Sequence, residues 1–172
     1  MEQRVKEAIA ASIQGFKLPT YYEIPDVGLY LEQTTKYIGE YLAPLESISI
    51  TSSMVGNYVK KGLVDNPVKK QYNRDQIAYL IFIAVAKTVL SLEDIQLLIQ
   101  LQKRTYPGEK AYEYFCREFE NILFYIFGLK DTVEEVGVET SDEKVMLRNT
   151  IITVAHKIYL DKFFSALREK TE

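Results

Sequence analysis

The spacing of apolar residues along the chain predicts a mainly helical protein. Apolar side chains recur at intervals of three and four residues in most segments, which gathers them on one face of a helix. The first two such stripes consist of Val5, Ala8, Ile9 and Ile13, and then of Leu31, Ile38, Leu42 and Leu45. Pro19 and Pro25 lie between the stripes and do not continue a helix, so we expect a loop there.

Residues that typically cap helices predict where the later helices begin and end. Thr51 or Ser52 is expected to cap a short helix that stops near Gly62, because glycine readily adopts the positive φ of a helix C-terminus. Signals of the same kind predict further helix starts at Asn73 with Gln76, at Ser91, after the break at 105–108, and at Thr140 with Glu143.

The segment 63–72, LVDNPVKKQY, is expected to form a small β-hairpin. Asp65, Asn66 and Pro67 lie between its two short runs, and these three residue types favour turns. We therefore predict two short strands that are joined around these three residues.

Composition narrows the class of protein. The chain has 172 residues, 47% of them apolar, which is enough to bury a core. A single cysteine, Cys116, excludes an internal disulfide, and with a single histidine, His156, no zinc site is expected. The first 15 residues lack a continuous apolar stretch, and the longest apolar run, 78–86, is about half of what a membrane helix needs. We expect a cytoplasmic protein in a reducing compartment, without membrane contact or cofactor.

Four lysines lie in the segment 52–72 of a chain whose formal net charge is −3. They are Lys60, Lys61, Lys69 and Lys70, and Asp65 is the one acidic residue among them. A local excess of positive charge in an acidic protein indicates either a negatively charged partner or a solvated surface, and lysine-rich segments are usually solvated.

The short helix predicted over 51–61 has two different sides. Met54, Val55, Tyr58 and Val59 fall on one side, and Ser53, Gly56, Asn57 and Lys60 fall on the other. A glycine inside a helix costs about 1 kcal/mol relative to alanine, so its presence among small polar residues suggests the close approach of a partner.

A DNA groove is one such partner. In a helix-turn-helix, the second helix enters the major groove while nearby basic residues contact phosphates. Asn57 can pair with adenine, and Ser52 or Ser53 can bond to bases or phosphate. Lys60, Lys61, Lys69 and Lys70 supply the electrostatic attraction, and Arg74 is a further phosphate candidate.

The order of these elements resembles the winged-helix region of the mercury-resistance regulator (MerR) family. The resemblance covers residues 28–102 and rests on Tyr58 with the Gly62–Leu63 pair, on the basic segment ending at Tyr72, and on the Ser-Leu-Glu-Asp-Ile motif at 91–95. The chain departs from that pattern at Gly56 and Asn57, where the family usually has arginine and tyrosine. Nearly the whole chain, including LPTYYEIPDVGLYLEQ and SMVGNYVKKGLV, is also similar to an uncharacterised bacterial domain-of-unknown-function family.

This resemblance implies an all-α, winged helix-turn-helix fold with a short β-wing, and a DNA-binding regulator that works as a dimer. We expect an N-terminal helix and loop at 1–27, the winged helix-turn-helix at 28–104, and a helical dimerisation or effector region at 105–172. The DNA-binding residues are then predicted to be Ser52, Ser53, Gly56, Asn57, Lys60, Lys61, Lys69, Lys70 and Arg74. The operator and any small-molecule effector are not predicted.

Two other classes of function stay open. Against an enzyme, Cys116 lies in an apolar stripe that favours a buried thiol, His156 is expected in the core or in an interface, and no phosphate loop or nucleophile elbow is present.

The other class is a protein-interaction module without DNA binding. Tyr114, Phe124, Tyr125 and Phe127 lie outside the main stripe of their helix, which predicts a homodimer interface formed by the C-terminal helices. The alternative for these residues is a single larger core that the N-terminal helices enclose.

Overall fold

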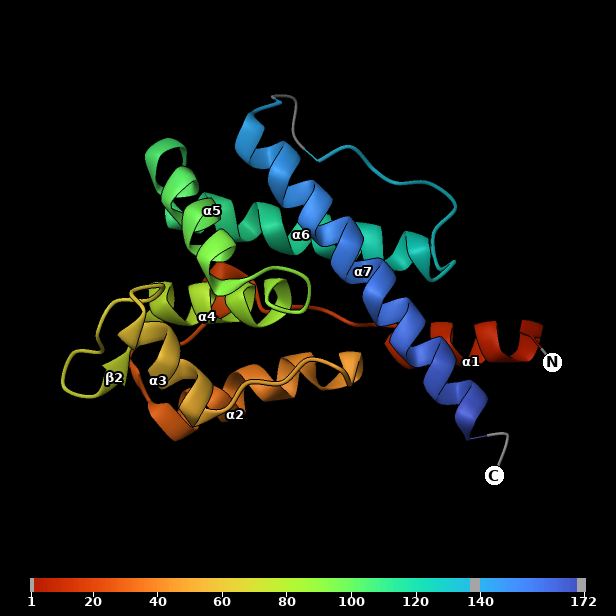
Figure 1. Ribbon diagram of the computed structural model, residues 1–172, viewed down its shortest axis with the longest axis horizontal. Coiled ribbons are helices and arrows are strands. Elements are labelled where there is room, and N and C mark those ends of the chain that lie inside the picture. Colours follow the sequence, from red (N-terminus) through yellow and green to blue (C-terminus); the bar gives the residue numbers. More distant parts are fainter. Residues whose placement is uncertain (1, 137–139, 170–172) are drawn as a thin grey trace.

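In a computed structural model, which describes residues 2–136 and 140–169, the chain is mainly α-helical with one small antiparallel sheet (Figure 1). The helices are α1 (Glu2–Ile13), α2 (Leu31–Leu42), α3 (Ser52–Lys60), α4 (Arg74–Ala86), α5 (Leu92–Thr105), α6 (Gly108–Ile126) and α7 (Asp142–Arg168). Two strands, β1 (Leu29–Tyr30) and β2 (Gln71–Tyr72), form the sheet, and Tyr21–Glu23 and Ala43–Leu45 are single 3-10 turns. The mainly helical fold class is therefore confirmed.

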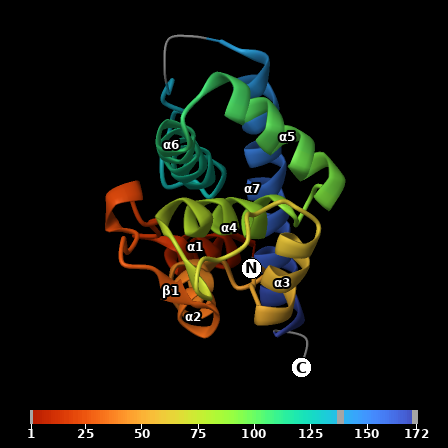
Figure 2. The same ribbon diagram turned by 90° about the vertical axis from the view of Figure 1, so that its left-hand side faces the viewer.

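Helix α4 lies at the centre of the molecule. Its long apolar run makes it hydrophobic on nearly all sides, as expected for a helix that is surrounded by protein. In both ribbon views it lies between α2 and α3 on one side and α5 and α6 on the other (Figure 1, Figure 2). Among the helices of the described residues, none is long and apolar enough to cross a membrane.

Helix α7 joins the two ends of the chain into one core. It packs along α6 and also contacts α1, α4 and α5. From α1, the side chains of Val5, Ile9 and Ile13 enter the same hydrophobic cluster as Ile151 and Val154 of α7. The N-terminal helix thus encloses a single larger core.

The aromatic residues at the end of α6 lie differently from the prediction. Tyr125 is exposed, but Phe127 is buried, with its ring centroid 5.3 Å from that of Tyr159. Phe127 was predicted to be surface and is covered because α7 crosses the end of α6. His156 is exposed on α7, so the core alternative for this residue is wrong, while the interface alternative stays a prediction.

Most of the predicted helix caps are confirmed. Thr51, Asn73 and Ser91 each accept a hydrogen bond from a backbone N–H three residues later. The last helix is an exception, because Ser141, and not Thr140, accepts from the N–H of Lys144. The first turn therefore begins one residue later than predicted.

The small sheet differs from the predicted hairpin. Strand β2 pairs with β1, with Leu29 opposite Tyr72 and Tyr30 opposite Gln71. The tight turn lies at Lys69–Lys70, and 65–67 form an irregular segment before it. The predicted turn around Asp65, Asn66 and Pro67 is wrong because other groups hold this backbone in place, as described below.

Candidate nucleic-acid interface

The short helix α3 is fixed at both of its ends. The Thr51 hydroxyl oxygen accepts a hydrogen bond from the Met54 N–H (3.2 Å), which satisfies one of the free N–H groups at the helix start. At the other end Gly62 has a φ of 77°, and the N–H of Leu63 donates to the Tyr58 carbonyl (2.9 Å). This is the Schellman arrangement, so the predicted stop near Gly62 is confirmed.

The two sides of α3 differ in exposure as the sequence predicts. Val55 and Tyr58 are buried in the core, and Lys87, which directly follows α4, lies against this side with its ammonium 5.9 Å from the Tyr58 ring centroid. The other side is exposed and consists of Ser52, Ser53, Gly56, Asn57 and Lys60.

Gly56 has no internal reason to be a glycine. A Cβ atom built at Gly56 would have no atom within 4 Å outside its own helix and chain neighbours, so alanine would fit there without a clash. Gly28, by contrast, would place a Cβ 3.2 Å from the Cβ of Gln71, and its φ is 80°. The backbone of α3 is therefore bare at Gly56 although packing does not require it.

The Lys69–Lys70 turn has an uncommon backbone. The N–H of Val68 donates to the Gln71 carbonyl (3.1 Å), and the N–H of Gln71 donates back to Val68 (2.9 Å). Lys69 has a φ of 50° and Lys70 a φ of 64°, the geometry of a type I′ turn, in which Asn-Gly is the favoured pair. Each non-glycine residue in this left-handed region costs about 1 kcal/mol or more.

The base of this turn is attached to the start of α4. The Gln76 side-chain amide donates to the carbonyls of Asp65 (3.0 Å) and Asn66 (3.1 Å), while its oxygen accepts from the N–H of Asn73 (2.8 Å). These bonds satisfy the buried Gln76 side chain and hold the backbone before the turn. The Lys69–Lys70 tip consequently extends from a supported base.

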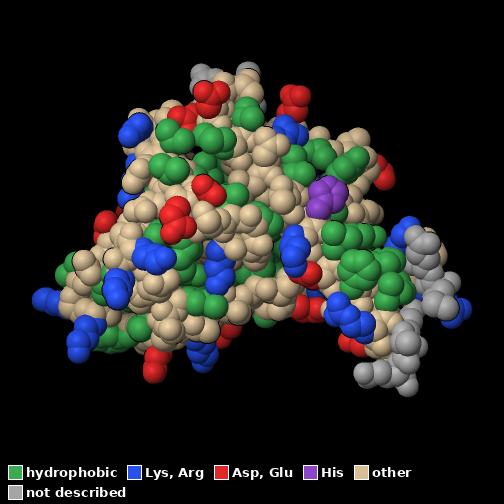
Figure 3. Space-filling model, viewed as in Figure 1, with side chains coloured by type: hydrophobic (Ala, Val, Ile, Leu, Met, Phe, Trp, Pro, Cys, Tyr) green, Lys and Arg blue, Asp and Glu red, His purple; other side chains and the backbone are tan. Residues whose placement is uncertain are grey.

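We call the exposed residues of α3 and of the turn, taken together, the α3–hairpin surface; they are Ser52, Ser53, Gly56, Asn57, Lys60, Lys69 and Lys70. Both parts lie at the same end of the molecule (Figure 1, Figure 2), and Lys and Arg side chains gather at that end in the space-filling view (Figure 3). Within the described part of the chain, Lys60, Lys69 and Lys70 form no ion pair.

Two of the predicted phosphate contacts lie elsewhere. The Lys61 ammonium is 3.9 Å from the Glu93 carboxylate of α5, at the edge of the surface. Arg74 is directed inward, where its guanidinium donates to the Ile24 carbonyl (2.9 Å) and lies 5.4 Å from the ring centroids of both Tyr21 and Tyr22. Arg74 therefore holds the loop before β1 and is not part of the α3–hairpin surface.

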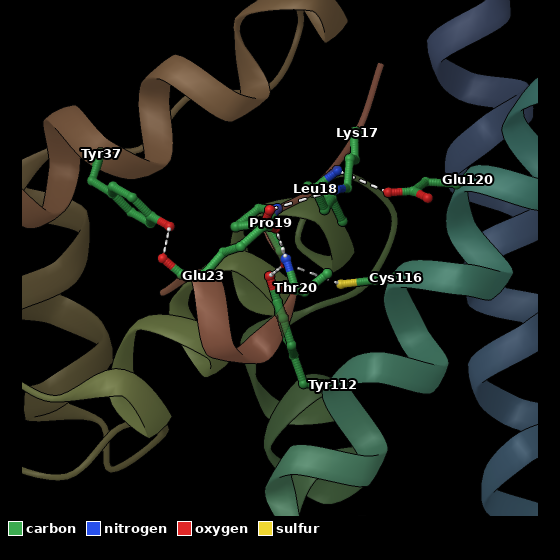
Figure 4. A network of polar contacts seen from close by, with 9 residues as sticks. All are labelled: Lys17, Leu18, Pro19, Thr20, Glu23, Tyr37, Tyr112, Cys116 and Glu120. Carbon is green, nitrogen blue, oxygen red and sulfur yellow. Dashed lines mark hydrogen bonds and ion pairs between the residues drawn. The ribbon is translucent and has the colours of Figure 1, made fainter. Parts of the chain in front are cut away.

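The same loop is bound on its other side to α6 (Figure 4). The N–H of Leu18 donates to the Glu120 carboxylate (2.9 Å), and the hydroxyl of Tyr112 donates to the Pro19 carbonyl (2.8 Å). Cys116 lies beside them, and burial raises the pKa of its thiol to about 12. The thiol is thus buried, as predicted, and stays protonated near neutral pH.

Val68 is a member of this region that is not predicted from the sequence. Its side chain is 71% exposed at the tip of the turn, next to the two lysines. The sequence places this apolar residue directly before a lysine pair, but that position predicts exposure only if the turn is known to lie at Lys69–Lys70.

Comparison with known proteins gives a family but no function. Residues 19–115 match the family described as Domain of unknown function (DUF1836). Neither the curated proteins nor the solved structures contain a match to the chain. The matched residues include the whole α3–hairpin surface and more than half of the chain. The chain therefore belongs to the DUF1836 family.

Proposed function

We propose that the protein is a DNA-binding transcription regulator of the winged helix-turn-helix type. In this proposal α2 and α3 form the helix pair, α3 lies in the major groove, and the β1–β2 sheet with the Lys69–Lys70 turn is the wing. Asn57, Ser52 and Ser53 face the bases, while Lys60, Lys69 and Lys70 contact phosphates.

One observation supports the proposal above the others. A glycine inside a helix and two lysines with positive φ are each unfavourable in the free protein. Among the described residues, nothing outside its own helix and chain neighbours lies within 4 Å of a Cβ built at Gly56, and no ion pair holds Lys69 or Lys70. A bare helix backbone and an extended basic tip are, however, what a helix needs to lie deep in a groove with phosphates on its flank. A solvated surface would not require any of the three.

The exposed apolar face of α7 supports a homodimer. Leu160 and Phe164 are about half exposed there, and hydrophobic side chains gather over the C-terminal part of α7 in Figure 3. A second copy that packs on this face would remove these side chains from water and give a two-fold arrangement for a palindromic site.

We expect Phe164→Ser to shift the protein toward monomer in sedimentation velocity, because it removes the largest apolar group of this face. Val145→Ser is the matched control, since Val145 is similarly exposed at the other end of α7. Equal sedimentation of the two variants and the wild type would contradict a dimer through this face.

Salt dependence of binding to random duplex DNA tests the proposed function. Each phosphate contact that is lost flattens the log–log slope of affinity against salt by about 0.9. Lys60→Gln, Lys69→Gln and Lys70→Gln together should therefore flatten the slope by about 2.7. Glutamine keeps the unbranched side chain and leaves the turn geometry unchanged.

The matched control removes the same amount of positive charge elsewhere. Lys17 and Lys157 are exposed and Lys130 is half-buried, and all three lie near acidic partners outside the α3–hairpin surface. Their change to glutamine should therefore leave the slope almost unaltered. If the wild type does not bind DNA even at low salt, the surface serves a protein partner instead.

A further inference from the structure

A cavity of about 220 Å³ lies among α4, α5, α6 and the first turns of α7, away from the α3–hairpin surface. The four helices that wall it are visible together in Figure 2. Its walls are mainly aromatic and aliphatic, with contributions from Phe82, Leu98, Ile99, Tyr106, Tyr114 and Leu147. Apolar cavities with a few polar groups, placed where several helices meet, are the usual form of small-molecule sites.

Two polar side chains of the wall, Tyr79 and Gln102, are already hydrogen-bonded within it. The Tyr79 hydroxyl donates to the Gln102 side-chain oxygen (2.9 Å), and the Gln102 amide donates to the Tyr106 carbonyl (2.7 Å). A ligand therefore need not bring polar atoms to satisfy them. A ligand with many polar atoms would instead lose its own bonds to water without replacement.

The charged side chains that border the cavity balance one another. Asp75 and Glu143 contribute two carboxylates, and Lys110 and Lys144 contribute two ammonium groups. The Lys144 ammonium lies 5.3 Å from the ring centroid of Tyr114 and 5.6 Å from that of Tyr106. The border thus has no excess of either sign that would select an ionic ligand.

Size and shape define the ligand further. An engineered apolar cavity of about 150 Å³ holds benzene, so this larger one has room for a two-ring compound. The rings of Phe82 and Phe115 meet edge to face at 5.2 Å, which provides flat aromatic faces and edges for stacking.

We propose that this cavity binds a small, uncharged, mostly apolar ring compound of about ten non-hydrogen atoms. The proposal is independent of DNA binding, because the cavity shares no residue with the α3–hairpin surface.

The test is a titration of the full chain with indole, followed by NMR of its methyl groups. We expect saturable shifts of the Ala78, Ile99 and Leu147 methyl signals, together with a melting temperature that rises with indole concentration. Indole-3-acetate and tryptamine carry the same rings with a charge. They should bind at least about tenfold more weakly, because the charge loses its hydration in the apolar interior and the balanced border has no excess of the opposite sign.

A cavity-filling variant gives the control. Ala111→Phe places a ring in the cavity and should abolish the indole shifts, while Ala8→Phe, on the exposed side of α1, should leave them unchanged. Absence of saturable shifts in the wild type, shifts spread over exposed sites such as Leu160, or equal binding of the charged compounds would overturn the proposal. The wild-type shift map decides the question even if Ala111→Phe does not fold.

Discussion

Two regions of the molecule differ in whether their energetically unfavourable residues have compensating contacts. One is the interface between α6 and α7, and the other is the α3–hairpin surface. In the first, Glu118 is 1% exposed, a costly place for a carboxylate, but the Arg148 guanidinium of α7 lies 3.3 Å away and offsets part of that cost. In the second, Gly56, Lys69 and Lys70 are unfavourable, and within the described residues no packing requires the glycine and no ion pair holds the two lysines.

This difference separates residues that the fold explains from residues that it does not. Gly62 and Gly56 make the same point within one short stretch, since Gly62 has the positive φ that ends α3 and Gly56 has neither a special φ nor a close neighbour. A segment whose residues lower stability, although its surroundings would accept more stable ones, is a candidate binding site for an external partner.

The largest effect is expected from removing the internal compensation in the first region. Arg148→Ala leaves the Glu118 carboxylate buried without a partner and should lower the free energy of unfolding by about 3 kcal/mol near neutral pH. Burial already raises the pKa of Glu118, and Arg148 opposes that rise, so the variant raises the pKa further. Urea unfolding at several pH values measures the effect.

The sign of the pH dependence follows from the raised pKa. When the pKa of a carboxyl is higher in the folded than in the unfolded state, the free energy of unfolding falls as the pH rises through the folded-state pKa. The deficit of Arg148→Ala should therefore be largest above the raised pKa of Glu118 and shrink as the pH falls toward the ordinary range of a carboxyl and Glu118 takes up a proton. Adding Glu118→Gln should make the deficit independent of pH. A deficit that is the same at all pH values in Arg148→Ala alone would show that Glu118 is not its cause.

An intermediate effect is expected from relieving the turn. Changing Lys69 to Asn together with Lys70 to Gly installs the pair that type I′ turns favour and should raise the free energy of unfolding by about 1–2 kcal/mol. Changing both lysines to glutamine removes the same charge without relieving the backbone, so stability should stay constant. Both variants should weaken DNA binding equally. Equal stability of the two variants would contradict the claim that the backbone of the Lys69–Lys70 turn is unfavourable.

Much of the helical framework is predictable from the sequence because its signals are local. Caps such as Thr51 and Ser91 act within a single turn, and the apolar run of α4 needs no knowledge of its neighbours to be placed in the core. The polar side of α3 follows from the same periodicity.

The rest depends on contacts between distant segments. Strands β1 and β2 have two residues each, too few for an alternating pattern, and pair across about forty residues. The inward direction of Arg74 depends on carbonyls some fifty residues earlier. Two lysines in the left-handed region contradict their usual preference, so turn propensity favoured Asp65–Pro67 instead.

The smallest change in stability is expected from replacing Gly56 with alanine, and the same variant tests most directly whether α3 enters a DNA groove. Both Gly56→Ala and Gly39→Ala place a methyl group in open space inside a helix and should each stabilise the protein by about 1 kcal/mol. Gly39 lies in α2, outside the α3–hairpin surface, and is the matched control.

The decisive measurement is the affinity of these two variants and the wild type for a duplex that the wild type selects from a random pool. We expect Gly56→Ala to bind about tenfold more weakly, because its methyl group crowds the closest approach of α3 to the bases, and Gly39→Ala to bind like the wild type. Wild-type affinity in Gly56→Ala, or failure to select any duplex, would contradict the role proposed for α3.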